Sequence, residues 1–517
     1  MKKRTFVLGA CLIAGTLVFT GCPGDGNGIP ANERLIVGTI GNPVSLDPVM
    51  ANDSASAQIF QQIYNRLFEL DFNTLAAVPS LAERHQFEAG PDGQLTRLRV
   101  WIRQGVRFHN GDEMRASDVA FSISRAMVSP QVSFIYTPIT SVEAVGNFEV
   151  LFVFSEPWIP ALNHLAHASS SIISERAYRE MGGDAFAQNP VGSGPMKFVN
   201  WVVGDHLELA RNDDFWGTNS RLQQIIFRTI PDAATRLMSL ETGEIDVMYM
   251  VLPADIPRLN ANPEVNVIRV AATNINYIGF NTAHPPLNDI RVREAIIYAT
   301  DLNAMVEHIF MGVGAPGRAP ITSTVWASAA DYLPQRPFNP ARARELLAEA
   351  GHAPGTLNLS IHVNEGNATR LDMATAMQGW LAEVGINLSI HVIEWAAYLD
   401  MTGRIDGGHQ LFILGWVAVT GDPDYALDIF HTRSFGAAGN RFFWSNPEMD
   451  ALLDAARGES NPQIRYNLYI EAQRLIHAGA PLIVAQEGET VIAARANVRN
   501  LIPNPAGEEN LWAAWID

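Results

Sequence analysis

The most informative stretch of this chain is NPVGSGPMKFVNWVVGDHLELARNDDFWG, residues 189–217. It begins with prolines and glycines, which favour a loop. An apolar run at residues 196–203 follows, and after Gly204 and Asp205 a second run covers residues 206–210. Two such runs joined by a short glycine-containing turn predict a β-hairpin with a loop in front of it.

Residues 79–127 form a second long stretch with clear local signals. Apolar residues alternate over residues 98–102, as on one face of a strand, and the Asn-Gly pair at 110–111 favours a hairpin turn. Ser117 is expected to cap a helix that follows it. Upstream, the apolar residues of the segment 57–70 have helical spacing, so we expect a helix that packs into the core.

Both stretches resemble the extracytoplasmic solute-binding proteins of family 5, which serve ABC importers of peptides and nickel. The first is similar to the pattern NPVGTGPYKF-x-x-W-x-x-G…L-x-RN-x-x-Y/FWG, and the second to PSLAE-x-W…G-V-K-F-H-D-G…D-V-x-F-S. The resemblance covers about residues 35–515. It implies an α/β, periplasmic-binding-protein-like fold of type II, with two lobes, a hinge and an additional α/β domain inserted in the first lobe.

The residue patterns of the second half favour an α/β fold without reference to the family. A helical pattern at residues 371–384 ends at Gly385, and apolar residues alternate immediately afterwards, over residues 386–392. Pro447 and Pro462 are each expected to open a further helix. This order of helix, glycine and strand predicts helices that pack on a sheet.

A chain of 517 residues is too long for one core. The apolar strand at residues 275–282 and the run at residues 482–486 are expected to be two crossings between lobes, and two crossings make a hinge. The predicted divisions are a signal peptide (1–21), a tether (22–34), lobe I (35–54, 187–282 and 486–517), its additional domain (55–186) and lobe II (283–485).

Composition excludes several functions. The formal net charge is −18, and such a surface repels nucleic acid and anionic lipid. Charged residues make up 17% of the chain and hydrophobic residues 47%, which is typical of a folded globular interior.

The N-terminus predicts where the protein works. Lys2, Lys3 and Arg4 precede an apolar run that is too short to span a bilayer, which is typical of a secretory signal. The residues before Cys22 resemble a bacterial lipobox, although Phe19 stands where that motif usually has leucine. The resemblance implies lipid modification of Cys22; an ordinary signal with an incidental cysteine is the alternative.

We found no catalytic or metal-binding constellation in the sequence. His164 and His167 have a helical spacing but lack further ligands nearby, so we expect structural roles. The glycines of residues 312–317 match a dinucleotide fingerprint, yet they follow a helical pattern instead of a strand, which predicts a loop. We therefore expect no enzyme, no cofactor and no metal site.

The segment 415–423, GWVAVTGDP, bears on the ligand. In dipeptide- and oligopeptide-binding relatives the matching stretch resembles G-W-x-x-D-x-x-D/E-P, and its first acidic residue binds the α-ammonium of the peptide. Val419 occupies that position here. Asp422 or a shifted loop replacing the lost carboxylate is the alternative. The candidate ligand-binding residues are Gly415, Trp416, Val419, Asp422, Asn440, Arg441, Trp395, Trp444 and Tyr277.

The resemblance implies a monomeric, lipid-anchored protein at the periplasmic face of the cytoplasmic membrane. Its expected partners are a peptide or peptide-like ligand and the permease subunits of an ABC importer. The alternatives are a non-peptide solute such as an oligosaccharide, an opine or chelated nickel, and a surface lipoprotein without a transport role. An extracytoplasmic hydrolase would need a base and a nucleophile, and the sequence suggests neither.

Overall fold

The structure is a computed structural model that describes residues 29–436 and 439–517. A ten-stranded mixed sheet runs through the whole molecule. Its strands, in spatial order, are β14 (Ile386–Ile393), β13 (Leu357–Asn364), β15 (Leu411–Val417), β12 (Val265–Phe280), β16 (Leu482–Arg495), β11 (Val247–Met248), β1 (Arg34–Thr39), β10 (Gln224–Thr229), β9 (His206–Arg211) and β8 (Met196–Val202).

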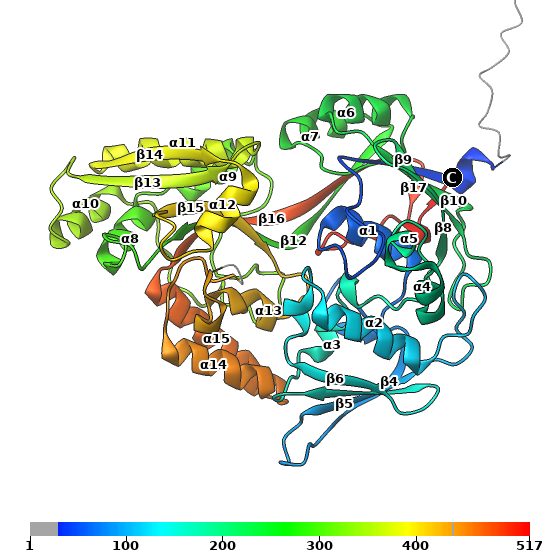
Figure 1. Cartoon of the computed structure of the whole chain (residues 1–517). Coiled ribbons are helices and arrows are strands. Elements are labelled where there is room, and N and C mark those ends of the chain that lie inside the picture. Colours follow the sequence, from blue (N-terminus) through cyan, green and yellow to red (C-terminus); the bar gives the residue numbers. More distant parts are fainter. Residues whose placement is uncertain (1–28, 437–438) are drawn as a thin grey trace, which may run out of the picture.

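The two long central strands, β12 and β16, join two lobes. They pair antiparallel with each other, and their opposite ends pair with different parts of the sheet. Residues 274–280 of β12 pair with β15, whereas Ala493 and Ala494 of β16 pair with β11. We call the part from β11 to β8 lobe I and the part from β15 to β14 lobe II; Figure 1 shows β12 and β16 running between them. The predicted two-lobed α/β fold is confirmed.

Lobe II surrounds its part of the sheet with helices. An apolar core of aliphatic side chains, including Ile361 and Leu381, lies between strands and helices. The predicted order of helix, glycine and strand is confirmed, because α11 ends just before Gly385 and β14. The helices are α8 (Ile290–Tyr298), α9 (Leu302–His308), α10 (Pro340–Glu349), α11 (Ala368–Glu383), α12 (Trp395–Thr402), α13 (Pro423–Leu427), α14 (Pro447–Gly458) and α15 (Pro462–Gly479).

Lobe I contains the hairpin that the sequence predicted. Strands β8 and β9 pair antiparallel, and Gly204 in the turn has a φ of +87°, a conformation that suits glycine. The lobe's helices and remaining short strands are α1 (Ser54–Ile63), α4 (Glu175–Met181), α5 (Gly183–Phe186), α6 (Ala233–Thr242), α7 (Ile256–Asn260), β17 (Val498–Arg499) and β18 (Trp515–Ile516).

A separate four-stranded sheet lies within the predicted additional domain, below lobe I in Figure 1. Its apolar face, with Leu98, Val100 and Phe152, packs against α2 around Ile123. The elements here are β2 (Phe68–Leu70), β3 (Ala77–Pro79), β4 (Ala82–Glu88), β5 (Arg97–Ile102), α2 (Ala116–Val128), β6 (Ile139–Ala144), β7 (Glu149–Phe154) and α3 (Ala161–His164). The residue boundaries of the domains stay a prediction.

Two local predictions are wrong in detail. The helix expected over residues 57–70 ends at Ile63, because the chain turns there and continues into β2. Ser117 does not cap α2; it lies inside the helix, and the carboxylate of Asp118 accepts the backbone N–H of Arg115 at 2.8 Å. Among the described residues, no helix has both the length and the apolar character to cross a membrane.

Candidate functional site

The two lobes contact each other through the additional domain, next to α3. The side-chain amide of Asn163 donates to the carbonyl of Leu75 at 3.1 Å and, across the junction, to the carbonyl of Thr420 at 2.8 Å. The backbone N–H of Ile159 donates to the carbonyl of Arg457 at 3.0 Å. These bonds link the additional domain with lobe II, so the two lobes are in contact at this point.

Charged side chains reinforce this contact. The guanidinium of Arg457 in α14 lies 2.9 Å from Asp424 and 3.2 Å from Asp428, both in lobe II, and 3.4 Å from Glu156 of the additional domain. Burial would raise the pKa of Asp424, but the charge of Arg457 more than offsets it and holds that pKa below its usual range. We call Glu156, Asn163, Asp424 and Arg457 the junction network.

Aromatic side chains fill the space beside the junction network. Trp416 and Tyr425 stack with their ring centres 5.2 Å apart and an interplanar angle of 11°. Tyr425 also contacts the rings of Phe134 and His164, which belong to the additional domain. A groove of about 290 Å³ is lined by these rings. Tyr425 therefore links Trp416, a predicted ligand-binding residue, to the additional domain.

Leu75 of the additional domain inserts into the core of lobe II. Its side chain is 2% exposed and packs in one cluster with Ala418 and Leu414. Its φ of +56° is unusual for a leucine. Gly421 makes this approach possible, because a Cβ there would lie only 2.8 Å from Leu75. The loop around Val419 is thus shaped by contact with the other lobe.

A small polar cavity lies where Val419 faces lobe I. Its volume is about 10 Å³, which is room for about one water molecule. It is lined by Gln61, Arg66, Glu69, Leu70, Phe72, Ala166, Val419, Asn504, Ala506 and Glu508. All of these except Val419 come from lobe I or its additional domain. In this arrangement the cavity lies between the two lobes and has no room for a group much larger than a water molecule.

The polar groups of this cavity are incompletely paired. Arg66 lies 3.1 Å from Glu508 and donates to the carbonyl of Ala166 at 2.6 Å. Burial raises the pKa of Glu508, and the charge of Arg66 opposes that rise. The carbonyl oxygen of the Gln61 side chain is buried and has no hydrogen-bond partner among the described residues. Such a group has a free energy cost unless a ligand or water pairs with it.

The structure places some predicted ligand residues at the lobe junction. Trp416 lines the aromatic groove and Val419 lines the polar cavity. Asp422 is buried and engaged by Arg465, with oxygen–nitrogen distances of 2.6 and 2.9 Å, and it also caps α13. In this arrangement the carboxylate of Asp422 is occupied by a partner inside lobe II.

Other predicted residues belong to the body of lobe II. Tyr277 and Trp444 are buried in one apolar cluster, and the Asn440 amide donates to three backbone carbonyls. Trp395 is 46% exposed, and Arg441 donates to the carbonyl of Leu399 and the hydroxyl of Thr402. Gly415 lies in β15, opposite Asn276 of β12. A ligand contact of these residues stays a prediction.

Sequence reasoning missed the lobe I side of the cavity. Gln61 and Arg66 lie in or just after α1, whereas Glu508 comes from the C-terminal return of the chain. Arg66 and Glu508 are 442 residues apart in the sequence. The local sequence around Glu508, GEEN at residues 507–510, is polar and is typical of a solvated loop. Nothing local indicates that Glu508 is largely shielded from solvent.

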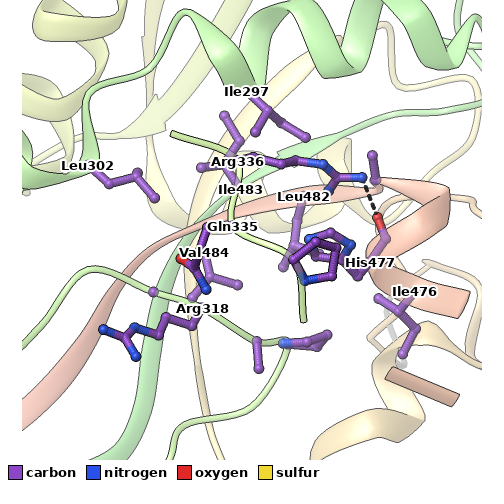
Figure 2. A pocket seen from close by; sticks show the side chains of 15 residues that line it. Ile297, Leu302, Arg318, Gln335, Arg336, Ile476, His477, Leu482, Ile483 and Val484 are labelled. Atoms are coloured by element: carbon purple, nitrogen blue, oxygen red, sulfur yellow. Dashed lines mark hydrogen bonds between the residues drawn. The ribbon is translucent and has the colours of Figure 1, made fainter. Parts of the chain in front are cut away.

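Another cavity lies beside strand β16, and Figure 2 shows the residues that line it. Its volume is about 90 Å³. The guanidinium of Arg336 donates to the carbonyl of His477 at 2.9 Å and also pairs with Glu294 at 3.2 Å. Its lining residues, such as Ile297 and Val484, all come from lobe II and β16. Because lobe I contributes nothing, movement of the lobes does not open or close it.

The two histidines considered as metal ligands have other surroundings. His164 Nδ1 lies 2.9 Å from the carbonyl of Ile135, and its Nε2 lies 3.5 Å from Asp424, which is longer than a normal hydrogen bond. His167 Nδ1 lies 2.7 Å from the hydroxyl of Ser169, and burial lowers the pKa of His167 to about 3. Residues 29–436 and 439–517 contain no group of three or more metal-ligating side chains.

The chain matches the family model "Bacterial extracellular solute-binding proteins, family 5 Middle" over residues 76–437. It is 27% identical to a dipeptide-binding protein of Escherichia coli strain K12, over 92% of this chain and 94% of the relative. It is 31% identical to a glutathione-binding protein of Pectobacterium atrosepticum, over 85% of both chains.

Among solved structures, the periplasmic binding protein DppA from Helicobacter pylori, in complex with the peptide STSA, superposes with a TM-score of 0.79. Its identity is 27%, and the match covers 93% of this chain and 98% of DppA. The chain belongs to the family 5 solute-binding proteins, which are extracytoplasmic transport proteins rather than enzymes. It is a solute-binding protein of an ABC importer for peptides or related solutes.

Proposed function

We propose that this protein is lipid-anchored through Cys22 and captures a peptide or peptide-like solute between its lobes for delivery to an ABC permease. The polar cavity between Val419 and lobe I carries the proposal, because its buried Gln61 oxygen lacks a partner within residues 29–436 and 439–517. Closure of two lobes around a solute removes the solute and the facing side chains from water, which favours binding.

The mechanism is a hinge motion without chemistry. β12 and β16 connect the lobes, and their pairing is interrupted by register shifts between Ala271 and Ile275 and between Asn276 and Tyr277. Irregular pairing marks a place where strands bend. The apparent affinity then depends on the fraction of free protein in the binding-competent form.

Small-angle scattering tests this mechanism. The radius of gyration of the protein is expected to decrease when it is saturated with a ligand, because the lobes close. Unchanged scattering on saturation contradicts hinge closure and favours a rigid platform, as expected for a surface lipoprotein without a transport role.

We further propose that simple dipeptides bind weakly and that longer or modified peptides bind better, because Val419 gives lobe II no carboxylate that would hold an α-ammonium in the closed form. A charge-assisted hydrogen bond contributes about 1.5–3 kcal/mol, or roughly ten- to a hundredfold in affinity. A calorimetric screen of dipeptides, longer peptides, glutathione, oligosaccharides, an opine and chelated nickel tests this. Submicromolar binding of plain dipeptides refutes the idea, and binding of only a non-peptide solute favours the alternative function.

Anchoring through Cys22 is tested separately, because Cys22 lies outside the described residues. The variant Cys22→Ser is expected to remain unprocessed or to be released from the membrane, since the acyl chains have no attachment site. Mass spectrometry of the purified mature protein provides the measurement. Cleavage elsewhere with an unmodified Cys22 would falsify the anchor.

A further inference from the structure

The polar cavity at Val419 has an unequal distribution of charge between its two walls. Lobe I contributes the carboxylates of Glu69 and Glu508 and the guanidinium of Arg66, whereas lobe II contributes only the apolar Val419. The two carboxylates outnumber the one guanidinium. A cavity with an excess of negative charge favours a ligand group that is positive.

The hydrogen-bonding groups favour the same kind of ligand group. Gln61 is 7% exposed; its side-chain N–H donates to Asn510 at 2.6 Å, while its oxygen accepts nothing among the described residues. Glu69 accepts from the hydroxyl of Ser80 at 2.6 Å and Glu508 accepts from Arg66, so each carboxylate has a second oxygen to offer. A group that fits these acceptors has several N–H donors and a positive charge.

We propose that Gln61 and Glu508 of lobe I bind a primary ammonium group of the solute, with Glu69 adding negative charge. This inference rests on the proposed function and names the part of the solute that the cavity recognises. An ammonium supplies three N–H donors at one point, which suits a small cavity lined by several side chains that carry acceptor oxygens.

The proposed ammonium contact involves lobe I alone, and this affects the balance between the open and closed forms. A contact made entirely with lobe I is equally available in the open and closed forms, so it strengthens binding without favouring closure. Closure then depends on contacts such as the junction network, which are made only when the lobes meet. Val419→Asp would place a second carboxylate on lobe II, and the ammonium would then favour the closed form.

The test compares a pool of lysine-free synthetic tetrapeptides with the same pool after N-acetylation, which removes the ammonium. Equilibrium dialysis with mass spectrometry measures retention by the full mature chain. The wild-type protein is expected to retain the free pool roughly ten- to a hundredfold better. Equal retention of both pools overturns the inference and leaves the proposed function intact; retention of neither pool contradicts the proposed function itself.

Variants then locate the acceptor. Glu508→Gln is expected to reduce the preference for free peptides at least about fivefold, and Glu508→Gln combined with Val419→Asp is expected to restore part of it. Glu241→Gln is the matched control, because Glu241 pairs with Arg258 on the surface of lobe I. If folded Glu508→Gln keeps the wild-type preference for free peptides, the assignment of Glu508 is overturned. If the variant does not fold, the comparison of the two peptide pools on the wild-type protein still tests the inference.

Discussion

The surfaces that face each other at the lobe junction differ in how completely their polar groups are paired. In the junction network, Arg457 contacts three carboxylates and Asn163 donates to two carbonyls. In the cavity at Val419, the buried oxygen of Gln61 has no partner in the described part of the chain, and burial raises the pKa of Glu508.

This difference indicates two separate tasks. The charged groups of the junction network are satisfied by the protein itself and hold the lobes together. Among the described residues, the unpaired groups on this side are uncharged indole N–H groups and an imidazole nitrogen of the adjacent groove, at Trp158, Trp416 and His164. A region with an unpaired buried acceptor gains free energy when a suitable donor arrives. In the proposed function, the closing contact and the recognising contact are therefore separate, and each is open to mutation on its own.

The largest expected effect comes from breaking the junction network. Arg457→Ala leaves the buried carboxylate of Asp424 without its cation, and such a loss typically lowers the free energy of unfolding by about 3–5 kcal/mol. Arg433→Ala is the control, because Arg433 is 37% exposed and pairs at the surface; its loss is expected to change stability by less than about 1 kcal/mol. Urea denaturation measures both, and equal effects would contradict the role of Arg457.

The next largest expected effect is a change of protein stability with pH, which arises from Glu509, the neighbour of the cavity residue Glu508. Glu509 adjoins Glu508, accepts from the Tyr249 hydroxyl at 2.9 Å, and has a pKa that burial raises to about 7. The folded state binds this proton more tightly than the unfolded state, in which the pKa is about 4.5. The contribution of Glu509 is therefore fully present below about pH 4.5 and is lost as the pH rises through about 7.

This contribution amounts to about 3 kcal/mol, since one pKa unit corresponds to about 1.4 kcal/mol. In Glu509→Gln the decrease of unfolding free energy between pH 4.5 and 8 is expected to be smaller than in the wild type by about that amount. Glu241→Gln is expected to keep the wild-type profile. Identical profiles for Glu509→Gln and the wild type would show that Glu509 titrates normally.

The smallest effect tests closure itself. Asn163→Ala removes one hydrogen bond across the junction, to Thr420, and such a bond contributes about 1 kcal/mol. The closed form then becomes less favourable, and ligand affinity is expected to fall about fivefold. Asn219→Ala is the control, because its amide bonds only within lobe I, to the carbonyl of Asp213. Affinity that is equal in the two variants argues against a closing role for Asn163.

The sequence by itself determined the elements whose causes are local. The hairpin of β8 and β9, the helices that begin at Pro447 and Pro462, and the α11–Gly385–β14 unit all depend on periodicity, turn glycines and helix-starting prolines within a few residues. The family and the two-lobed architecture were likewise predicted, because long motifs identify a fold as a whole.

Only the tertiary structure decided what surrounds each side chain of the site. Asp422, predicted to face a ligand, pairs with Arg465, and Glu508, which follows a proline- and glycine-containing segment, is largely shielded beside Arg66 with 12% of its side chain exposed. The ion pair of Arg66 and Glu508 joins residues 442 positions apart, so no local pattern encodes it. Burial and charge partners depend on which segments fold against each other, and these decide whether a carboxylate supports the protein or recognises a solute.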